Sequence, residues 1–152
     1  MSSFWPRHGP VWDGLGITNR GDLLLVEAKS HIPEVVSTVA AGEASLDRIR
    51  ASLNETKHYL GVKEETAWTS PFYQYANRLA HLYLLRVLNN LPAYLMFVYF
   101  VNDREQGGPM TQAEWEGALV LQKTLLGVRR HQLSAYVLDV YVDVATLVRD
   151  EG

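Results

Sequence analysis

The sequence predicts one α/β domain with a mixed four-stranded sheet, in which parallel strands join an antiparallel hairpin and helices flank the sheet. Three features predict it: two strand-like runs around a short loop, segments with helical spacing, and a long apolar run between two of them. A strand that follows another through a helix usually pairs with it in parallel. With 152 residues, 47% of them hydrophobic, the chain has the size of a single core. We therefore expect residues 1–152 to form one domain.

The first predicted element is the hairpin. Residues 11–18 and 22–29 form two short strand-like runs, separated by the three-residue loop Asn19-Arg20-Gly21. A glycine at the third loop position suits a left-handed bulge. In a hairpin with this loop, the numbers of directly paired residues sum to 40.

Two helices are expected between the hairpin and the long apolar run. Leucine and isoleucine recur at helical spacing over 46–60, and Gly61 supplies a stop. Ser70 and Pro71 have the pattern of an N-cap followed by proline at the first helical position. They predict a second helix that runs to about Asn90.

The remaining elements are two strands and the helix between them. The run 93–101 is apolar and aromatic without polar alternation, which is typical of a central strand covered on both faces. Thr111 and Glu114 form a capping box that opens a helix ending near Gly127. Over 137–144, valines alternate with Asp and Tyr, which predicts an edge strand with its aspartates facing solvent.

Composition restricts the setting. The chain has no cysteine, which excludes disulfides and thiolate metal sites. The N-terminus lacks the basic and apolar pattern of a secretion signal, and the longest apolar run is about half of a membrane-spanning helix, so we expect a cytoplasmic protein without membrane contact. The net charge is −3, with 14 basic and 17 acidic residues, so contact with nucleic acid would require a local patch.

Three ionisable residues of the hairpin are expected to converge. The numbers of Asp13 and Glu27 sum to 40, so the predicted register places them opposite each other. Directly opposed residues have Cβ atoms about 4.5–5.5 Å apart, which lets two carboxylates share one cation. Lys29 lies two residues beyond Glu27 and therefore on the same face. Mg²⁺ or Mn²⁺ held there would polarise a phosphoryl group and lower the pKa of a bound water.

This pattern resembles the signature of the PD-(D/E)XK nuclease superfamily: an acidic residue, then Asp or Glu, any residue, and Lys on the next strand. Asp13, Glu27, Ala28 and Lys29 match it. The resemblance implies a restriction-endonuclease-like fold over about the first 100 residues. It also implies metal ligation by both carboxylates and the Ala28 carbonyl, with Asp13, Glu27 and Lys29 as catalytic residues.

The resemblance extends in part to the second helix. The nuclease branch that resembles RecB carries Gln-x-x-x-Tyr there, and Gln74 matches the glutamine, but the residue four positions on is Arg78. The resemblance implies a catalytic position for Gln74. Arg78 lies one turn along the same face, suited to contacting the site or a substrate phosphate. None of the residues before Asp13 is acidic, whereas many members have an acidic residue there, so a second metal is not expected.

The residues leave two functions open. The first is metal-dependent hydrolysis of nucleic acid, with DNA favoured over RNA as the substrate. The second is a catalytically silent nuclease-like domain that serves as a protein-interaction module or homodimer, which the acidic balance favours. For Asp13, Glu27 and Lys29, the non-catalytic interpretation is a cross-strand ion pair on an exposed hairpin. For Gln74 and Arg78 it is a solvated stripe on a long helix.

Overall fold

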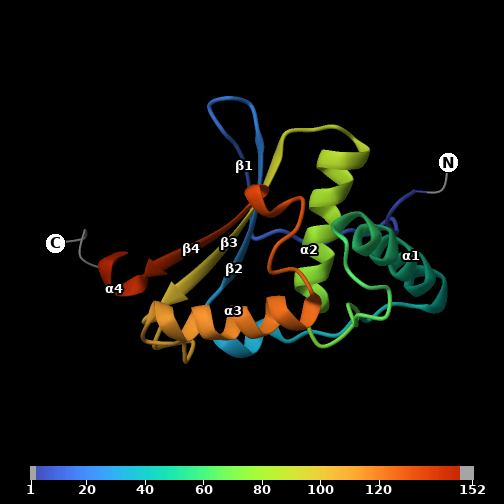
Figure 1. The fold of residues 1–152 in the computed structure, drawn as a ribbon. Helices are drawn as coiled ribbons and strands as arrows, with labels where there is room; N and C mark the ends of the chain where they lie inside the picture. Colours follow the sequence, from blue (N-terminus) through green and yellow to red (C-terminus); the bar gives the residue numbers. More distant parts are fainter. Residues whose placement is uncertain (1–2, 148–152) are drawn as a thin grey trace.

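The computed structural model describes residues 3–147 and shows a four-stranded mixed sheet with helices beside it (Figure 1). The order of the strands across the sheet follows the chain: β1 (Gly14–Ile17), β2 (Leu23–Lys29), β3 (Ala93–Val101) and β4 (Val137–Asp143). β1 pairs with β2 in antiparallel, whereas β2–β3 and β3–β4 are parallel. The predicted α/β class and mixed sheet are confirmed.

Three long helices connect these strands. The helical elements are η1 (Ile32–Val35), α1 (Glu43–Leu60), α2 (Tyr73–Tyr83), the π-helical turn η2 (Leu84–Leu88), α3 (Gln112–Leu126), η3 (Ser134–Tyr136) and α4 (Val144–Leu147). Among residues 3–147, no helix has the length and apolar character needed to cross a membrane.

The predicted ends of α1 and α3 are confirmed. α1 stops at Gly61 and α3 at Gly127, each with φ of 73°, a left-handed conformation that glycine adopts without strain. Thr111 accepts a hydrogen bond from the backbone N–H of Glu114, and the Glu114 carboxylate accepts from the backbone N–H of Thr111. This capping box opens α3 as expected.

The predicted start of the second helix is wrong. α2 begins at Tyr73, and Ser70 and Pro71 lie outside it. The backbone of this segment pairs with Ser37 instead: Ser37 donates to the Pro71 carbonyl and Tyr73 donates to the Ser37 carbonyl. The Ser37 hydroxyl then accepts from the backbone N–H of Gln74, so a residue distant in sequence satisfies the first turn of α2.

The hairpin has the predicted register, with Gly14 paired to Val26 and φ of 86° at Gly21. β1 is shorter than expected, because it begins at Gly14 rather than at position 11. The groups that would extend the ladder are engaged elsewhere: Arg78 donates to the carbonyl of Val11, and the backbone N–H of Ala28 donates to a side chain, that of Asp13.

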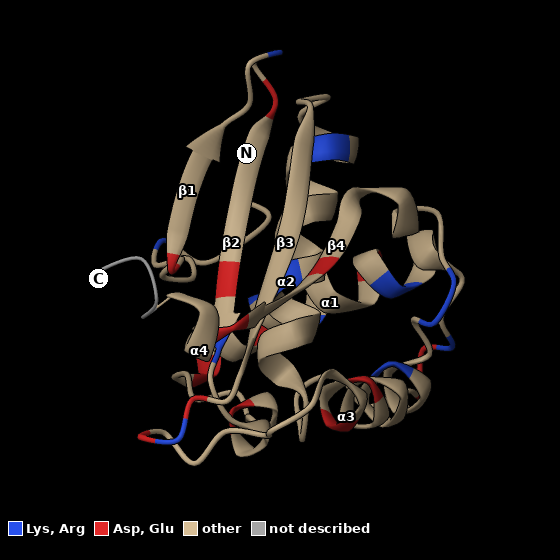
Figure 2. Ribbon diagram, turned by 90° about the vertical axis from the view of Figure 1, so that its left-hand side faces the viewer, with Lys and Arg blue, Asp and Glu red and all other residues tan. Residues whose placement is uncertain are grey.

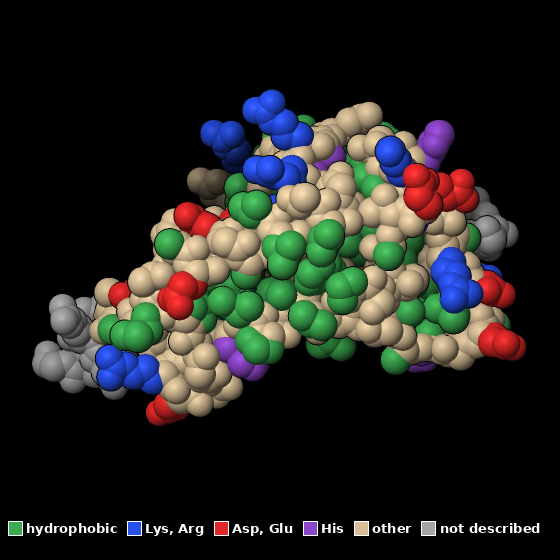
Figure 3. Space-filling view, turned by 60° about the horizontal axis from the view of Figure 1, so that its bottom comes forward, with side chains coloured by type: hydrophobic (Ala, Val, Ile, Leu, Met, Phe, Trp, Pro, Cys, Tyr) green, Lys and Arg blue, Asp and Glu red, His purple; other side chains and the backbone are tan. Residues whose placement is uncertain are grey.

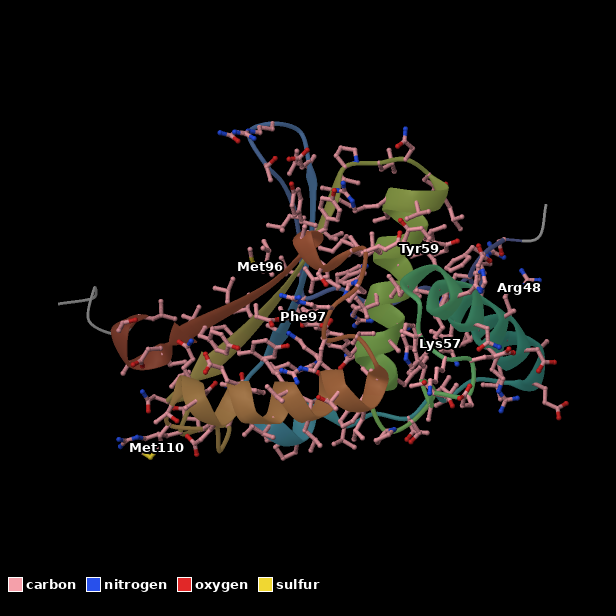
Figure 4. All side chains as sticks on the ribbon, in the orientation of Figure 1. Arg48, Lys57, Tyr59, Met96, Phe97 and Met110 are labelled. Carbon is pink, nitrogen blue, oxygen red and sulfur yellow. The ribbon has the colours of Figure 1, made fainter. Side chains whose placement is uncertain are left out.

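The helices cover one face of the sheet. On that face, Tyr75 of α2 stacks on Phe97 with ring centroids 4.7 Å apart, and Trp115 of α3 packs 4.9 Å from Tyr99. Figure 2, in which the left-hand side of Figure 1 faces the viewer, shows the strands in front of α2. Burial alternates along β3, and Figure 4 shows Met96 and Phe97 pointing to opposite sides of the sheet. β3 is central as predicted, but the expectation that both of its faces are covered is wrong, since the residues of its second face are only half-buried.

β4 lies at the edge of the sheet, as predicted, but with its polar side turned inward. Asp139 pairs with Phe97 in register, so it faces the helical layer, where Lys123 of α3 forms an ion pair with it. Asp143 accepts a hydrogen bond from the Asn102 amide at 3.1 Å. The prediction of solvent-facing aspartates is therefore wrong, since both carboxylates have protein partners and the valines occupy the uncovered face.

Candidate functional site

Glu27 is the centre of the candidate site. It follows Leu25 on the helix-covered face of β2 and is 3% exposed, opposite the first turns of α2. A carboxylate this deeply buried destabilises the folded state unless charged and hydrogen-bonding partners surround it.

Four N–H groups surround the Glu27 carboxylate. Oε1 accepts from Lys29 Nζ at 2.7 Å and from Gln74 Nε2 at 2.9 Å. Oε2 accepts from Arg78 Nε at 2.7 Å and lies 2.7 Å from Arg78 Nη2. A carboxylate has about four lone-pair sites, so the three hydrogen bonds and the ion-pair contact with Nη2 together saturate it. Gln74 and Arg78 reach it together because they are one helical turn apart.

Gln74, for which the resemblance implies a position at the site, contacts both Glu27 and Lys29 but not Asp13. Lys29 Nζ donates to Gln74 Oε1 at 2.6 Å, so lysine, glutamine and glutamate form a closed triangle. The Lys29 side chain is 11% exposed, so its ammonium is largely enclosed by the protein. Two cations, Lys29 and Arg78, thus share one carboxylate.

Arg78 is also fixed on its outer side. Its guanidinium carbon lies 4.7 Å from the centroid of the Trp12 ring, a cation–π contact. Nη2 donates to the Val11 carbonyl at 3.2 Å and Nη1 donates to Asn77 Oδ1 at 3.3 Å. The interpretation of this helix face as a solvated stripe is wrong, because the Arg78 side chain is only 6% exposed.

Asp13 lies immediately before β1 and is exposed. Its Oδ2 accepts the backbone N–H of Ala28 at 2.8 Å, and its own N–H donates to the Val26 carbonyl at 3.1 Å. Asp13 is therefore anchored on the strand that carries Glu27, but it shares no hydrogen-bond donor with it. Each carboxylate is stabilised by its own partners, which relieves the repulsion between them.

These residues offer the carboxylate and carbonyl oxygens that a divalent cation prefers as ligands. Among residues 3–147 there is no group of three or more His, Asp or Glu side chains that could hold a metal. Mg²⁺ nevertheless needs only one or two carboxylates with several waters. Asp13 is accessible, whereas Glu27 becomes a ligand only if one of its partners leaves. Ala28 follows Glu27 in the chain, and its backbone N–H donates to Asp13, so Ala28 adjoins both acidic residues.

Behind the network the protein is closed. A cavity of about 10 Å³ separates Glu27, Lys29 and Gln74 from the rings of Tyr75 and Tyr99, space for about one water molecule. Burial raises the pKa of both tyrosine hydroxyls, and the charge of Asp139 adds to it, so both hydroxyls stay neutral.

Sequence reasoning missed several residues of this site. Trp12 and Asn77 hold Arg78, and Tyr99 closes the cavity behind Glu27. A period of two along the predicted central strand would have placed Tyr99 with Phe97 on one face. No sequence signal indicated that Trp12 packs on a side chain from the second helix.

His81 lies one turn beyond Asn77 and packs on Trp5, with ring centroids 4.6 Å apart. Burial lowers its pKa from 6.5 to about 4, against a smaller raising effect of the Asn77 carbonyl, which accepts from Nδ1, and the nearby Arg78 charge lowers it further. The folded protein therefore favours the neutral form of the His81 imidazole.

The depressed pKa of His81 predicts acid sensitivity. Because the folded-state pKa is below the unfolded-state value, its stabilising contribution is present above pH 6.5 and is lost as the pH falls toward 4. We expect the free energy of unfolding to fall by about 2 kcal/mol more in wild type than in His81→Phe across this interval. Urea titrations at several pH values measure it, and parallel pH profiles of the two proteins would exclude His81 as the cause.

Comparisons with models of protein families, with curated proteins and with solved structures found no match to this chain.

Proposed function

We propose that the protein hydrolyses phosphodiester bonds of nucleic acid through a PD-(D/E)XK-type site on a restriction-endonuclease-like fold. DNA is the favoured substrate over RNA. One observation carries the proposal. Glu27 and Lys29 from β2 and Gln74 from α2, which belong to one superfamily pattern, form a mutual hydrogen-bonded triangle. Asp13, the remaining acid of the pattern, is bound to the same strand at Ala28.

The residues have distinct roles in this proposal. Asp13 and Glu27, with the Ala28 carbonyl, would hold Mg²⁺ or Mn²⁺, which supplies Lewis-acid polarisation and a water of lowered pKa. Lys29 orients the attacking water and offsets the negative charge that develops on the phosphoryl oxygens. Gln74 donates to Glu27 and accepts from Lys29, so it fixes the position of both.

Arg78 is the proposed contact to substrate. A phosphate offers the same pair of acceptor oxygens as a carboxylate, so a substrate phosphate can compete with Glu27 for the guanidinium. Transfer of Arg78 to the phosphate would free Oε2 of Glu27 to act as a ligand. The proposal thus links substrate binding to opening of a site that is saturated in its absence.

The second candidate is a catalytically silent domain of the same fold, which acts as a protein-interaction module or homodimer. The observation that favours it is the saturation of the Glu27 carboxylate by Lys29, Gln74 and Arg78. In that case the network stabilises the contact between β2 and α2. The excess of acidic residues favours this candidate, because it disfavours contact with nucleic acid.

A nuclease assay separates the two candidates. Single- and double-stranded DNA and RNA are incubated with the protein in Mg²⁺, in Mn²⁺ and in chelator. We expect metal-dependent cleavage by wild type and none by Asp13→Asn, which loses one ligand charge. Exposed Asp47→Asn on α1 is the matched control and should cleave like wild type. Equal products from Asp13→Asn and wild type would remove Asp13 from the mechanism.

Metal binding is predicted independently of turnover. A ligand that binds only the folded state stabilises it by mass action, so millimolar Mn²⁺ should raise the melting temperature of wild type. Because Asp13 is the accessible carboxylate, Asp13→Asn should lose this shift. Thermal melts with and without Mn²⁺ measure it. Absence of a shift in wild type, together with absence of cleavage, would establish the silent domain.

A further inference from the structure

The outward face of α3 differs from that of the other long exposed helix. The exposed residues of α1 include Glu43, Asp47, Arg48 and Glu55. On α3, no residue after Glu116 that faces outward is charged, and three large apolar side chains lie there: Val120, 49% exposed, Leu121, 58%, and Leu125, 54%. Figure 3 shows hydrophobic side chains gathered on the side of the molecule where α3 lies.

The inward face of α3 is also apolar. Trp115, Leu119 and Leu126 are buried against the sheet and its neighbours. The C-terminal half of α3 thus carries large apolar side chains on its outward face as well as on its inward face. Clustered exposed apolar side chains often mark a site of association. The outward face of this half is therefore a candidate for contact with a partner.

The shape of this face fits a second copy of itself. Its N-terminal half contains two exposed small residues, Ala113 and Gly117, and no atom lies within 4 Å of the place that a Gly117 side chain would occupy. Its C-terminal half is bulky, with Leu121 and Leu125. In an antiparallel pair of α3 helices with a twofold axis at Leu121, paired positions sum to 242, so Leu125 of each copy lies opposite Gly117 of the other.

The charges fit the same arrangement. Two exposed acidic residues, Glu114 and Glu116, lie in the N-terminal half of α3, and exposed Arg129 and Arg130 follow its C-terminal end. An antiparallel twofold pairing brings the acidic end of each helix to the basic end of the other. A parallel arrangement would instead place like charges together.

We propose that the protein forms a twofold-symmetric homodimer through antiparallel packing of α3 on α3, with Leu125 of each copy over Gly117 of the other. The inference does not rest on the proposed nuclease activity. A helix of 15 residues is about 22 Å long, which makes an interface smaller than the ~800 Å² per partner of a standard complex. Interfaces below the standard size are typical of weak or transient complexes, so we expect dissociation in the micromolar range.

Sedimentation velocity from roughly 1 to 300 µM protein, the range where a small interface dissociates, tests the proposal. Wild type should shift from monomer to dimer with concentration. Leu121→Glu places two like charges at the twofold axis and should raise the dissociation constant at least about 100-fold. Gly117→Leu fills the space that receives Leu125 and should also yield monomer. Both positions are solvent-exposed in the monomer, and circular dichroism confirms that the variants fold.

A control and a charge exchange make the test specific to α3. Leu138, 39% exposed, lies on the uncovered face of the sheet, and Leu138→Glu should dimerise like wild type. Glu116→Arg and Arg129→Glu should each weaken the dimer about two- to fivefold, and their combination should restore it. Wild type that stays monomeric at all concentrations would overturn the proposal, as would a dimer that Leu138→Glu disrupts and Leu121→Glu leaves intact.

Discussion

Replacing Glu27 by Gln should lower the free energy of unfolding by about 3 kcal/mol, although the substitution removes no heavy-atom volume. Glu27 is 3% exposed, and it neutralises both Lys29 and Arg78. Without its charge, the Arg78 guanidinium stays enclosed beneath Trp12 with no anion. Removing one partner of a buried ion pair is costly because the remaining charge cannot be solvated. Urea denaturation at neutral pH measures the loss.

A double-mutant cycle separates this loss from a packing defect. Arg78→Met removes the stranded cation, so Glu27→Gln should be less harmful in an Arg78→Met background, by at least about 1 kcal/mol. Exposed Glu105→Gln is the matched control and should change stability by less than about 0.5 kcal/mol. Losses that simply add in the double variant would mean that Glu27 and Arg78 act independently.

Much of the fold follows from local signals in the sequence. The capping box at Thr111, the stops at Gly61 and Gly127, and the left-handed Gly21 place element ends because each rests on backbone chemistry within a few residues. The start of α2 was not predictable in this way. Its first turn is completed by the distant Ser37, an interaction that no local pattern indicates.

The sides of the sheet were harder to assign than its order. The apolar run of β3 suggested a strand covered on both faces, yet only one of its faces is fully buried. The alternation in β4 was recognised, but which of its two sides faces the helices was not. Asp139 faces inward and forms an ion pair with Lys123. A polar residue faces the interior when a partner of opposite charge is supplied by another element, and the sequence of β4 alone does not contain that partner.

The sequence predicted which residues of β2 and of α2 lie together, but not the contacts that join the two elements. The period of two placed Lys29 with Glu27, and helical spacing placed Arg78 with Gln74, because both rules are geometric. That the two pairs would close into one network depends on how α2 lies across β2. The saturation of Glu27 is a property of that packing.

The Lys29 ammonium is the group on which the proposed chemistry depends most. It lies 2.7 Å from Glu27 Oε1 and 2.6 Å from Gln74 Oε1, held by two side chains rather than by solvent. Such a preorganised cation stabilises developing negative charge without reorganisation at the moment of reaction. The fold depends on it less, because Arg78 still neutralises Glu27 when Lys29 is absent.

Lys29→Ala should therefore remain folded while turnover falls by roughly two or more orders of magnitude, as for other positioned electrostatic or general-base groups. The rise in melting temperature with Mn²⁺ should survive, because both carboxylates remain and a cation that opposed the metal is gone. Exposed Lys63→Ala is the matched control and should cleave like wild type. Single-turnover cleavage and thermal melts measure the two effects separately. If Lys29→Ala cleaved like wild type while Asp13→Asn was inactive, the site would depend on metal but would work by a mechanism other than that of the superfamily.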